Sequence, residues 1–217
     1  MGTLLNRRRY MGGKPSAQMV DIEYLQSDGN QWIELGIYGS PDLDFTIDFE
    51  PLDLVDELRS WTGTGSYFGV MSGGNYELSG YNRTNIDTKG CFFWYNRGEA
   101  NGYTVRVGLT ASRVTVSKSG SVFTRPNGTT TTMNGYSSWV DPTTKTIALF
   151  ASKNSNGEIN HPGKMKLYSI KFEKNDTVIL DLVPVRVGQV GCLYDKVSGE
   201  LFKNKTSTPF ILGPDKT

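Results

Sequence analysis

Cysteine and histidine are scarce in this sequence of 217 residues, which holds two cysteines and one histidine. Cys91 and Cys192 lack the spacing of metal ligands, and each falls in an apolar segment, so we expect two buried thiols and no sign of an oxidising compartment. A single histidine, His161, excludes a metal site built from several imidazoles. It lies in the loop 160–163, where we expect it to face solvent. We therefore expect neither a metal nor another cofactor.

Long apolar runs are also missing. No stretch approaches the ~20 apolar residues that a membrane-spanning helix needs, and the first residues lack the apolar centre of a secretory signal. The net charge is only +1, which leaves no broad positive field to attract nucleic acid. We therefore expect a protein that is made in the cytoplasm and has neither a membrane nor a nucleic acid as its partner.

Turn-forming residues, in contrast, are abundant. The chain has 25 glycines and 9 prolines, aromatic residues make up 12% of it, and no helical period is sustained. This composition is typical of many short strands joined by turns, and an all-β sandwich of this length is commonly one domain. The strand-like segments are 32–38, 43–50, 67–71, 91–95, 103–107, 113–118, 121–125, 146–151, 165–173, 178–185, 191–194 and 200–203.

Local patterns add detail to these segments. Apolar and polar residues alternate over Leu43–Glu50, which predicts a strand with one buried face. Ser119-Gly120 predicts a tight hairpin turn, and Asp195–Gly199 predicts the turn of a C-terminal hairpin, with Gly199 supplying a positive φ. The polar stretches 72–90 and 126–138 are predicted to be long loops.

Residues 1–19 form a basic arm that differs from everything after it. No acidic residue precedes Asp21, and Gly12, Gly13 and Pro15 interrupt any helix. This pattern predicts that residues 1–19 are irregular and dock on a partner. Residues 20–217 are predicted to form one sandwich domain. The expected anchoring residues combine apolar side chains with positive charge: Leu4, Leu5, Arg7, Arg8, Arg9, Tyr10 and Lys14.

Two segments near the ends of the chain share one design. Val20–Ile37 and Leu182–Phe202 each consist of a strand, a turn rich in Gly, Asp, Asn or Ser, and a second strand. We expect two hairpins that meet in space and close a β-sandwich from both ends.

The segments EYLQSDGNQWIELG (residues 23–36) and VGCLYDKVSGELF (residues 190–202) carry a family resemblance. In order and spacing they resemble the concanavalin A-like, or laminin-G-like, jelly-roll domains in structural proteins of tailed bacteriophages and prophages, especially those of gut bacteria. The resemblance covers nearly the whole chain beyond residue 20. It implies an all-β jelly-roll sandwich of two antiparallel sheets.

The same resemblance implies a function without catalysis. The protein is expected to be a virion structural protein, a capsid decoration or head-fibre type appendage, made in the cytoplasm of the bacterial host. Its expected partners are other virion proteins, either of the capsid or of the portal and tail, and further copies of itself in a dimer or trimer. An alternative is a lectin-like module that binds host glycans, for which Trp61 and Trp139 beside loops are the candidate stacking platforms.

A β-glucanase is the third alternative, because concanavalin-like folds also serve as glycoside hydrolases. That mechanism needs three carboxylates at alternate positions of one strand. Asp48 and Glu50 match two of them, but Thr46 occupies the position of the nucleophile and cannot replace a carboxylate. The sequence therefore predicts no enzyme.

Seven acidic residues lie between positions 42 and 57. A solvated acidic face is the plainest interpretation. Two others remain open, a Ca²⁺ site built from oxygen ligands and a surface that receives the basic arm of a neighbouring subunit. The segment Cys91–Tyr95 is apolar on both faces, which predicts a covered central strand or a subunit interface.

Overall fold

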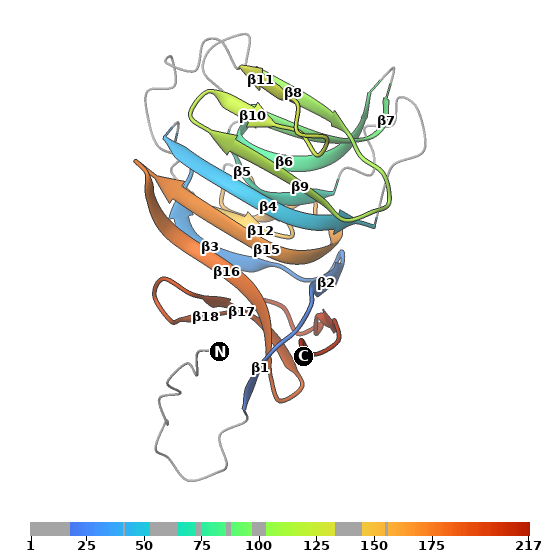
Figure 1. The fold of residues 1–217 in the computed structure, drawn as a ribbon, viewed down its shortest axis with the longest axis vertical. Helices are drawn as coiled ribbons and strands as arrows, with labels where there is room; N and C mark the ends of the chain where they lie inside the picture. Colours follow the sequence, from blue (N-terminus) through green and yellow to red (C-terminus); the bar gives the residue numbers. More distant parts are fainter. Residues whose placement is uncertain are drawn as a thin grey trace.

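The computed structural model describes residues 18–40, 42–52, 65–72, 75–85, 88–96, 103–132, 145–154 and 156–217. Within this part of the chain every regular element is a β-strand, and no helix could cross a lipid bilayer. The strands form two largely antiparallel sheets that are stacked as in a β-sandwich (Figure 1). The all-β prediction is therefore confirmed for the residues described.

The larger sheet has eleven strands. Its main path is β11 (Thr130–Thr132), β10 (Val122–Thr124), β9 (Val114–Ser119), β4 (Leu43–Pro51), β15 (Lys164–Lys174), β16 (Thr177–Val187), β17 (Val190–Asp195) and β18 (Leu201–Lys203). Three short strands join it at the side: β1 (Met19–Asp21) pairs with β16, β2 (Leu25–Asp28) with β15, and β19 (Ile211–Leu212) with β2.

The smaller sheet has eight strands. Its path is β14 (Ile159–Asn160), β13 (Ser152–Lys153), β5 (Ser66–Ser72), β6 (Asn75–Asn85), β7 (Thr88–Asn96) and β8 (Tyr103–Gly108). Strand β12 (Thr146–Leu149) pairs with β5 and also with β3 (Ile33–Tyr38). The single pair of residues between β13 and β5 is parallel.

The core lies between the two sheets, and β4 shows how the sequence builds it. Its burial alternates strictly, as predicted, so that Leu43, Phe45, Ile47 and Phe49 are buried. The ring of Phe45 packs edge-on against that of Phe68 from the smaller sheet, with 5.2 Å between ring centroids. Burying an aromatic side chain contributes roughly 2–3 kcal/mol, and such contacts hold the two layers together.

Both predicted turns are present. Strands β9 and β10 form a hairpin whose turn holds Gly120 at φ 54°. Strands β17 and β18 form the C-terminal hairpin, with Gly199 at φ 78°.

The prediction of a hairpin at the N-terminal end is wrong. The turn at Gly29 exists, but it passes the chain from one layer to the other: β2 pairs in the larger sheet and β3 in the smaller. The buried Gln31 side chain makes this corner, because it accepts hydrogen bonds from the Ser27 hydroxyl and the Asp28 amide and donates one to the Pro209 carbonyl. In a paired hairpin, hydrogen bonds between the two strands would satisfy main-chain groups such as the Asp28 amide. Here the Gln31 side chain does so.

The prediction of a long loop over residues 72–90 is also wrong. Most of this stretch is strand β6, eleven residues long, which pairs with β5 on one side and β7 on the other. Its polar and glycine-rich sequence has a low intrinsic preference for a strand, so the pairing on both sides decides its conformation. The stretch 126–138 holds the short strand β11, and its residues beyond 132 lie outside the description.

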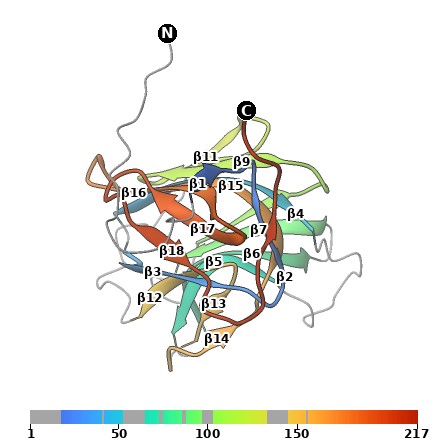
Figure 2. The ribbon, with the colours of Figure 1, turned by 90° about the horizontal axis from the view of Figure 1, so that it is seen from below.

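The two ends of the domain do meet, but only the C-terminal one is a hairpin. The N-terminal strand β1 pairs with β16, and β2 pairs with β19. Figure 2 looks at this end of the molecule, with β4 and β15 on one side, β5 and β12 on the other, and β17 and β18 lying across the end. The segments closest to the two chain ends therefore close the same end of the sandwich.

Candidate functional site

The site residues predicted from the sequence fall outside the part of the chain that the structure describes. This holds for the anchoring residues of the arm and for both candidate glycan-binding tryptophans. These residues are Leu4, Leu5, Arg7, Arg8, Arg9, Tyr10, Lys14, Trp61 and Trp139.

The structure does describe how the arm joins the body. Met19 pairs with Val187 and Asp21 with Val185, so β1 is a strand of the larger sheet from its first residue. The Asp21 carbonyl also accepts a hydrogen bond of 2.9 Å from the amide of Lys216, near the C-terminus. The root of the arm is therefore fastened on both sides by main-chain hydrogen bonds.

An ion pair adds to this fastening. Arg186 of β16 binds Asp215 through two hydrogen bonds of 2.7 and 2.6 Å, a bidentate arrangement that fixes geometry. Accordingly, the pKa of Asp215 is lowered, chiefly by the hydrogen bond from Arg186. The C-terminal segment thus lies along β1 and locks it against the sheet.

The acidic side chains of β4 are paired with cations from the neighbouring strands. Asp44 binds the buried Lys118 at 2.8 Å. Asp48 binds Arg113 through two hydrogen bonds of 2.9 and 2.6 Å. Asp44 and Asp48 alternate with the buried residues of β4, so they lie on its face that points away from the core. The described acidic residues therefore form a charge-paired sheet surface.

This pairing bears on the Ca²⁺ site and on the glucanase that the sequence analysis considered. Among the described residues no group of three or more His, Cys, Asp or Glu side chains could hold a metal ion. Asp48 and Glu50, the two residues at glucanase positions, are both held in ion pairs, with Arg113 and Lys166. Asp53, Asp56 and Glu57 lie outside the description.

Two tyrosines lie within this charged surface. The rings of Tyr24 and Tyr168 meet edge to face, with 5.7 Å between centroids. The guanidinium carbon of Arg113 lies 3.9 Å from the Tyr168 centroid, and Lys166 Nζ lies 5.1 Å from that of Tyr24, both within the range of a cation–π contact. Together with Asp48 and Glu50, these four residues form what we call the tyrosine cluster.

A β-bulge in β15 lies at this cluster. Leu167 pairs with Phe49 and Ser169 pairs with Asp48, so Tyr168 is an extra residue without an opposite neighbour on β4. Bulges redirect side chains and are common beside functional sites. At this bulge the Tyr168 hydroxyl donates a hydrogen bond of 3.1 Å to Glu50.

Glu50 and burial together fix the protonation of Tyr168. Burial first, and then the hydrogen bond to the negative Glu50, raise the pKa of Tyr168 to about 12. The phenol therefore remains protonated at every physiological pH. The cluster offers aromatic rings, cations and carboxylates at one surface, which suits binding of a polar molecule rather than catalysis by a phenolate.

A second polar cluster lies on the smaller sheet, next to Trp32. Lys153 binds Glu34 and the hydroxyl of Thr146, and the Thr146 hydroxyl donates to Glu34 at 2.5 Å. The Lys153 ammonium lies 6.0 Å from the centre of the Trp32 ring. These four residues come from β3, β12, β13 and the residue before β3, so they tie the edge of the smaller sheet together.

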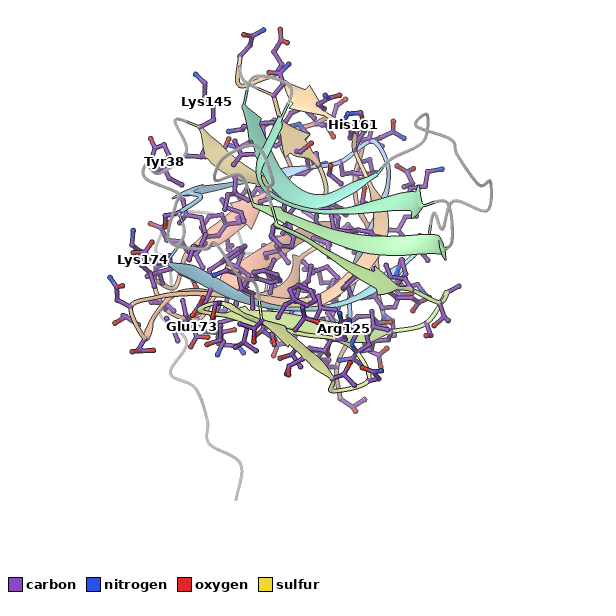
Figure 3. The ribbon with its side chains drawn as sticks, turned by 90° about the horizontal axis from the view of Figure 1, so that it is seen from above. Tyr38, Arg125, Lys145, His161, Glu173 and Lys174 are labelled. Carbon is purple, nitrogen blue, oxygen red and sulfur yellow. The ribbon has the colours of Figure 1, made fainter. Side chains whose placement is uncertain are left out.

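Neither His161 nor Cys192 is fully exposed to solvent. His161 is half-buried, against the prediction that it faces solvent, and burial lowers its pKa. It lies on the side of the smaller sheet, opposite Glu173 and Lys174 (Figure 3). Cys192 is buried, as predicted, and burial raises the pKa of its thiol. The Cys91 and Trp94 side chains lie outside the description.

The tyrosine cluster could not be found by spacing alone, because its residues come from four separate segments. The one sequence pattern that points to the cluster is the alternation of β15, which places Lys164, Lys166 and Tyr168 on the same face.

No family model, curated protein or solved structure matches this chain.

Proposed function

We propose that this chain is a structural protein of a tailed-bacteriophage virion, a capsid decoration or head-fibre type appendage that is carried on the particle by its N-terminal arm. We also infer the finer fold, a concanavalin A-like jelly roll. Both rest on the resemblance of residues 23–36 and 190–202. The stacked sheets and the pairing of N-terminal strands beside C-terminal ones are compatible with that fold.

One observation supports the carrying role most: the root of the arm is built into the sheet. Strand β1 has a register of three residue pairs with β16, and Arg186 and Asp215 hold the C-terminal segment beside it. A pull on the arm would therefore be transmitted into the sandwich through main-chain hydrogen bonds. This is the connection that a tethered module needs.

The arm would act by ordering on its partner. The guanidinium groups of Arg7, Arg8 and Arg9 would pair with acidic or main-chain oxygens. Leu4, Leu5 and Tyr10 would fill apolar pockets. The partner is then another virion protein, of the capsid or of the portal and tail. The protein would be made in the host cytoplasm and reside in the virion, with no cofactor.

Deletion of Met1–Lys14 tests this proposal. We expect a folded protein with an unchanged melting temperature that no longer joins particles, with its copy number per purified particle reduced on the order of 100-fold, because the removed residues supply the contacts. The measurement is quantitative mass spectrometry of particles assembled with the variant. Incorporation at the wild-type level would refute the anchor.

Charge reversal gives a finer version of the same test. Arg7→Glu, Arg8→Glu and Arg9→Glu together should weaken attachment, and the wild-type attachment should weaken with added salt because exposed ion pairs are screened. Lys145→Glu, a single reversal on the body, is a control that should leave attachment unchanged. Salt-independent attachment would contradict a role for the arginines.

The alternative function, glycan binding, is favoured by the tyrosine cluster. Aromatic rings next to carboxylates and cations are a common surface for sugars. A glycan array should then show binding that Tyr168→Ala abolishes while the unfolding temperature stays within a few degrees. No bound glycan with the wild-type protein would leave only the structural role.

A further inference from the structure

Lys118 is a lysine on the core side of the larger sheet. In the register of β4, β9 and β10 it lies directly opposite Phe45 on one side and Phe123 on the other. Directly opposite residues on neighbouring strands point to the same side of a sheet, and both phenylalanines belong to the core. The aliphatic stem of Lys118 therefore starts within a row of core side chains.

Burial sets the ion pair of Lys118 apart. Among the ion pairs of the described residues it has the most buried cation: the Lys118 side chain is 0% exposed, whereas that of Lys166, paired with Glu50, is 24% exposed. Removing an ammonium and a carboxylate from water is costly, and the attraction between them repays that cost only in part. Burial therefore favours a change that removes both charges at once.

The Lys118 ammonium reaches a carboxyl oxygen that a second donor also holds. Lys118 Nζ donates hydrogen bonds of 2.8 Å to the Leu43 carbonyl and of 2.8 Å to Asp44 Oδ1. The Gly120 amide donates one more, also of 2.8 Å, to Asp44 Oδ1. A main-chain N–H at this position stabilises the negative charge that develops on the oxygen when a nucleophile attacks the carboxyl carbon, as in an oxyanion hole. The site thus combines a nucleophile, a carboxyl group and an oxyanion donor.

The attacking group must be the neutral amine, because an ammonium has no free electron pair. Burial lowers the pKa of Lys118, against the opposing effects of Asp44 and Asp42. The proton can pass directly to the Asp44 carboxylate, because Nζ and Oδ1 are hydrogen-bonded. This transfer gives an amine beside a carboxylic acid, which are the reactants of amide formation.

We infer that Lys118 and Asp44 become joined by an isopeptide bond, an amide between Lys118 Nζ and Asp44 Cγ. The bond from Nζ to Cγ forms, the bond from Cγ to Oδ2 breaks, and Oδ2 leaves as water with two protons from the ammonium nitrogen. Nothing is oxidised or reduced, so the step needs no other reactant.

The product fits the hydrogen bonds that surround the two side chains. Nitrogen keeps one proton, which can be donated to the Leu43 carbonyl, and Oδ1 becomes the amide oxygen and still accepts from Gly120. The buried charges are gone, and a hydrogen-bonded amide costs less to bury than an ion pair. The bond ties β4 to β9, two neighbours in the larger sheet.

The mass of the intact, denatured full-length protein tests the bond. We expect the main species to be lighter than the amino-acid sequence by one water molecule. Lys118→Arg keeps the positive charge but cannot form this amide, so its mass should show no deficit, and Asp44→Ala should show none either. Lys166→Arg, at the more exposed pair with Glu50, is the matched control and should keep the deficit. A wild-type protein at its full sequence mass overturns the inference.

Peptide mapping of the wild-type protein locates the bond without any variant. After proteolysis, we expect one branched peptide that contains both Asp44 and Lys118 and carries the whole deficit. A water deficit in any other peptide, or one that persists in Lys118→Arg, contradicts the assignment.

This inference goes beyond the proposed function and does not depend on it. Purified protein shows the bond whether or not the chain is carried on a particle. The arm-deleted chain should keep the water deficit even though it no longer joins particles, so the bond and the anchor are tested separately.

Discussion

Replacement of Asp195 by alanine is expected to lower the free energy of unfolding by about 3 kcal/mol, which is a large fraction of the stability of a single domain. The carboxylate is buried in the turn between β17 and β18. It accepts hydrogen bonds from the amides of Asp181, Val197 and Ser198, and one of 2.6 Å from the Ser198 hydroxyl. Alanine would leave three main-chain donors without this acceptor.

Chemical denaturation at pH 7 measures this effect, and Glu200→Ala is the matched control. Glu200 is exposed and adjoins the same turn, so its replacement should change the free energy of unfolding by less than about 0.5 kcal/mol. A loss below about 1 kcal/mol for Asp195→Ala would mean that water replaces the carboxylate, against the buried position described above.

The same residue predicts a pH dependence. Burial alone would raise the pKa of Asp195, but the hydrogen bonds from Ser198, Asp181 and Val197 outweigh it and hold the pKa below its ordinary value of 3.8. Because the folded pKa lies below the unfolded one, this carboxylate stabilises the fold fully above the unfolded pKa, and the contribution disappears as the pH falls through the folded pKa. Below about pH 4 the wild type should therefore lose stability more steeply than Asp195→Asn. Identical slopes would contradict the lowered pKa.

Replacement of Gly163 by alanine is expected to cost about 3 kcal/mol for a steric reason. A Cβ at this position would lie 2.5 Å from the carbonyl oxygen of Ser66 and 3.0 Å from its carbonyl carbon. Both sides are held by main-chain hydrogen bonds, from Gly163 to Phe150 and from Ser66 to His161. Strand β5, which begins at Ser66, would have to move.

Gly36→Ala separates steric from conformational cost. Gly36 has φ 71° and open space around its Cβ position, so alanine there should cost only about 1 kcal/mol, the strain of the left-handed backbone. Thermal unfolding followed by circular dichroism compares the two variants. Equal losses would mean that the contact between Gly163 and Ser66 relaxes freely.

The local features of the fold could be predicted from the sequence, and the partners of the strands could not. The alternation of Leu43–Glu50 and the turns at Gly120 and Gly199 depend on residues close in sequence, and all three are as expected. The strands that pair with β2 and β3 lie more than 100 residues away in the sequence. The turn at Gly29 therefore does not show that the chain passes from one sheet to the other there.

The surfaces could be predicted even less. Tyr24 and Tyr168 meet because β15 pairs with β2, which places Leu167 opposite Leu25, and the sequence does not show which strands pair.

A reconstruction of the phage particle that we propose carries this chain, with the chain traced in it, tests the central claim most directly. The account predicts that the density joining the sandwich to the particle is continuous with β1 at Met19 and contains the side chains of Arg7, Arg8 and Arg9 against the partner. A sandwich held to the particle by another surface, with residues 1–17 free of any neighbour, would contradict it.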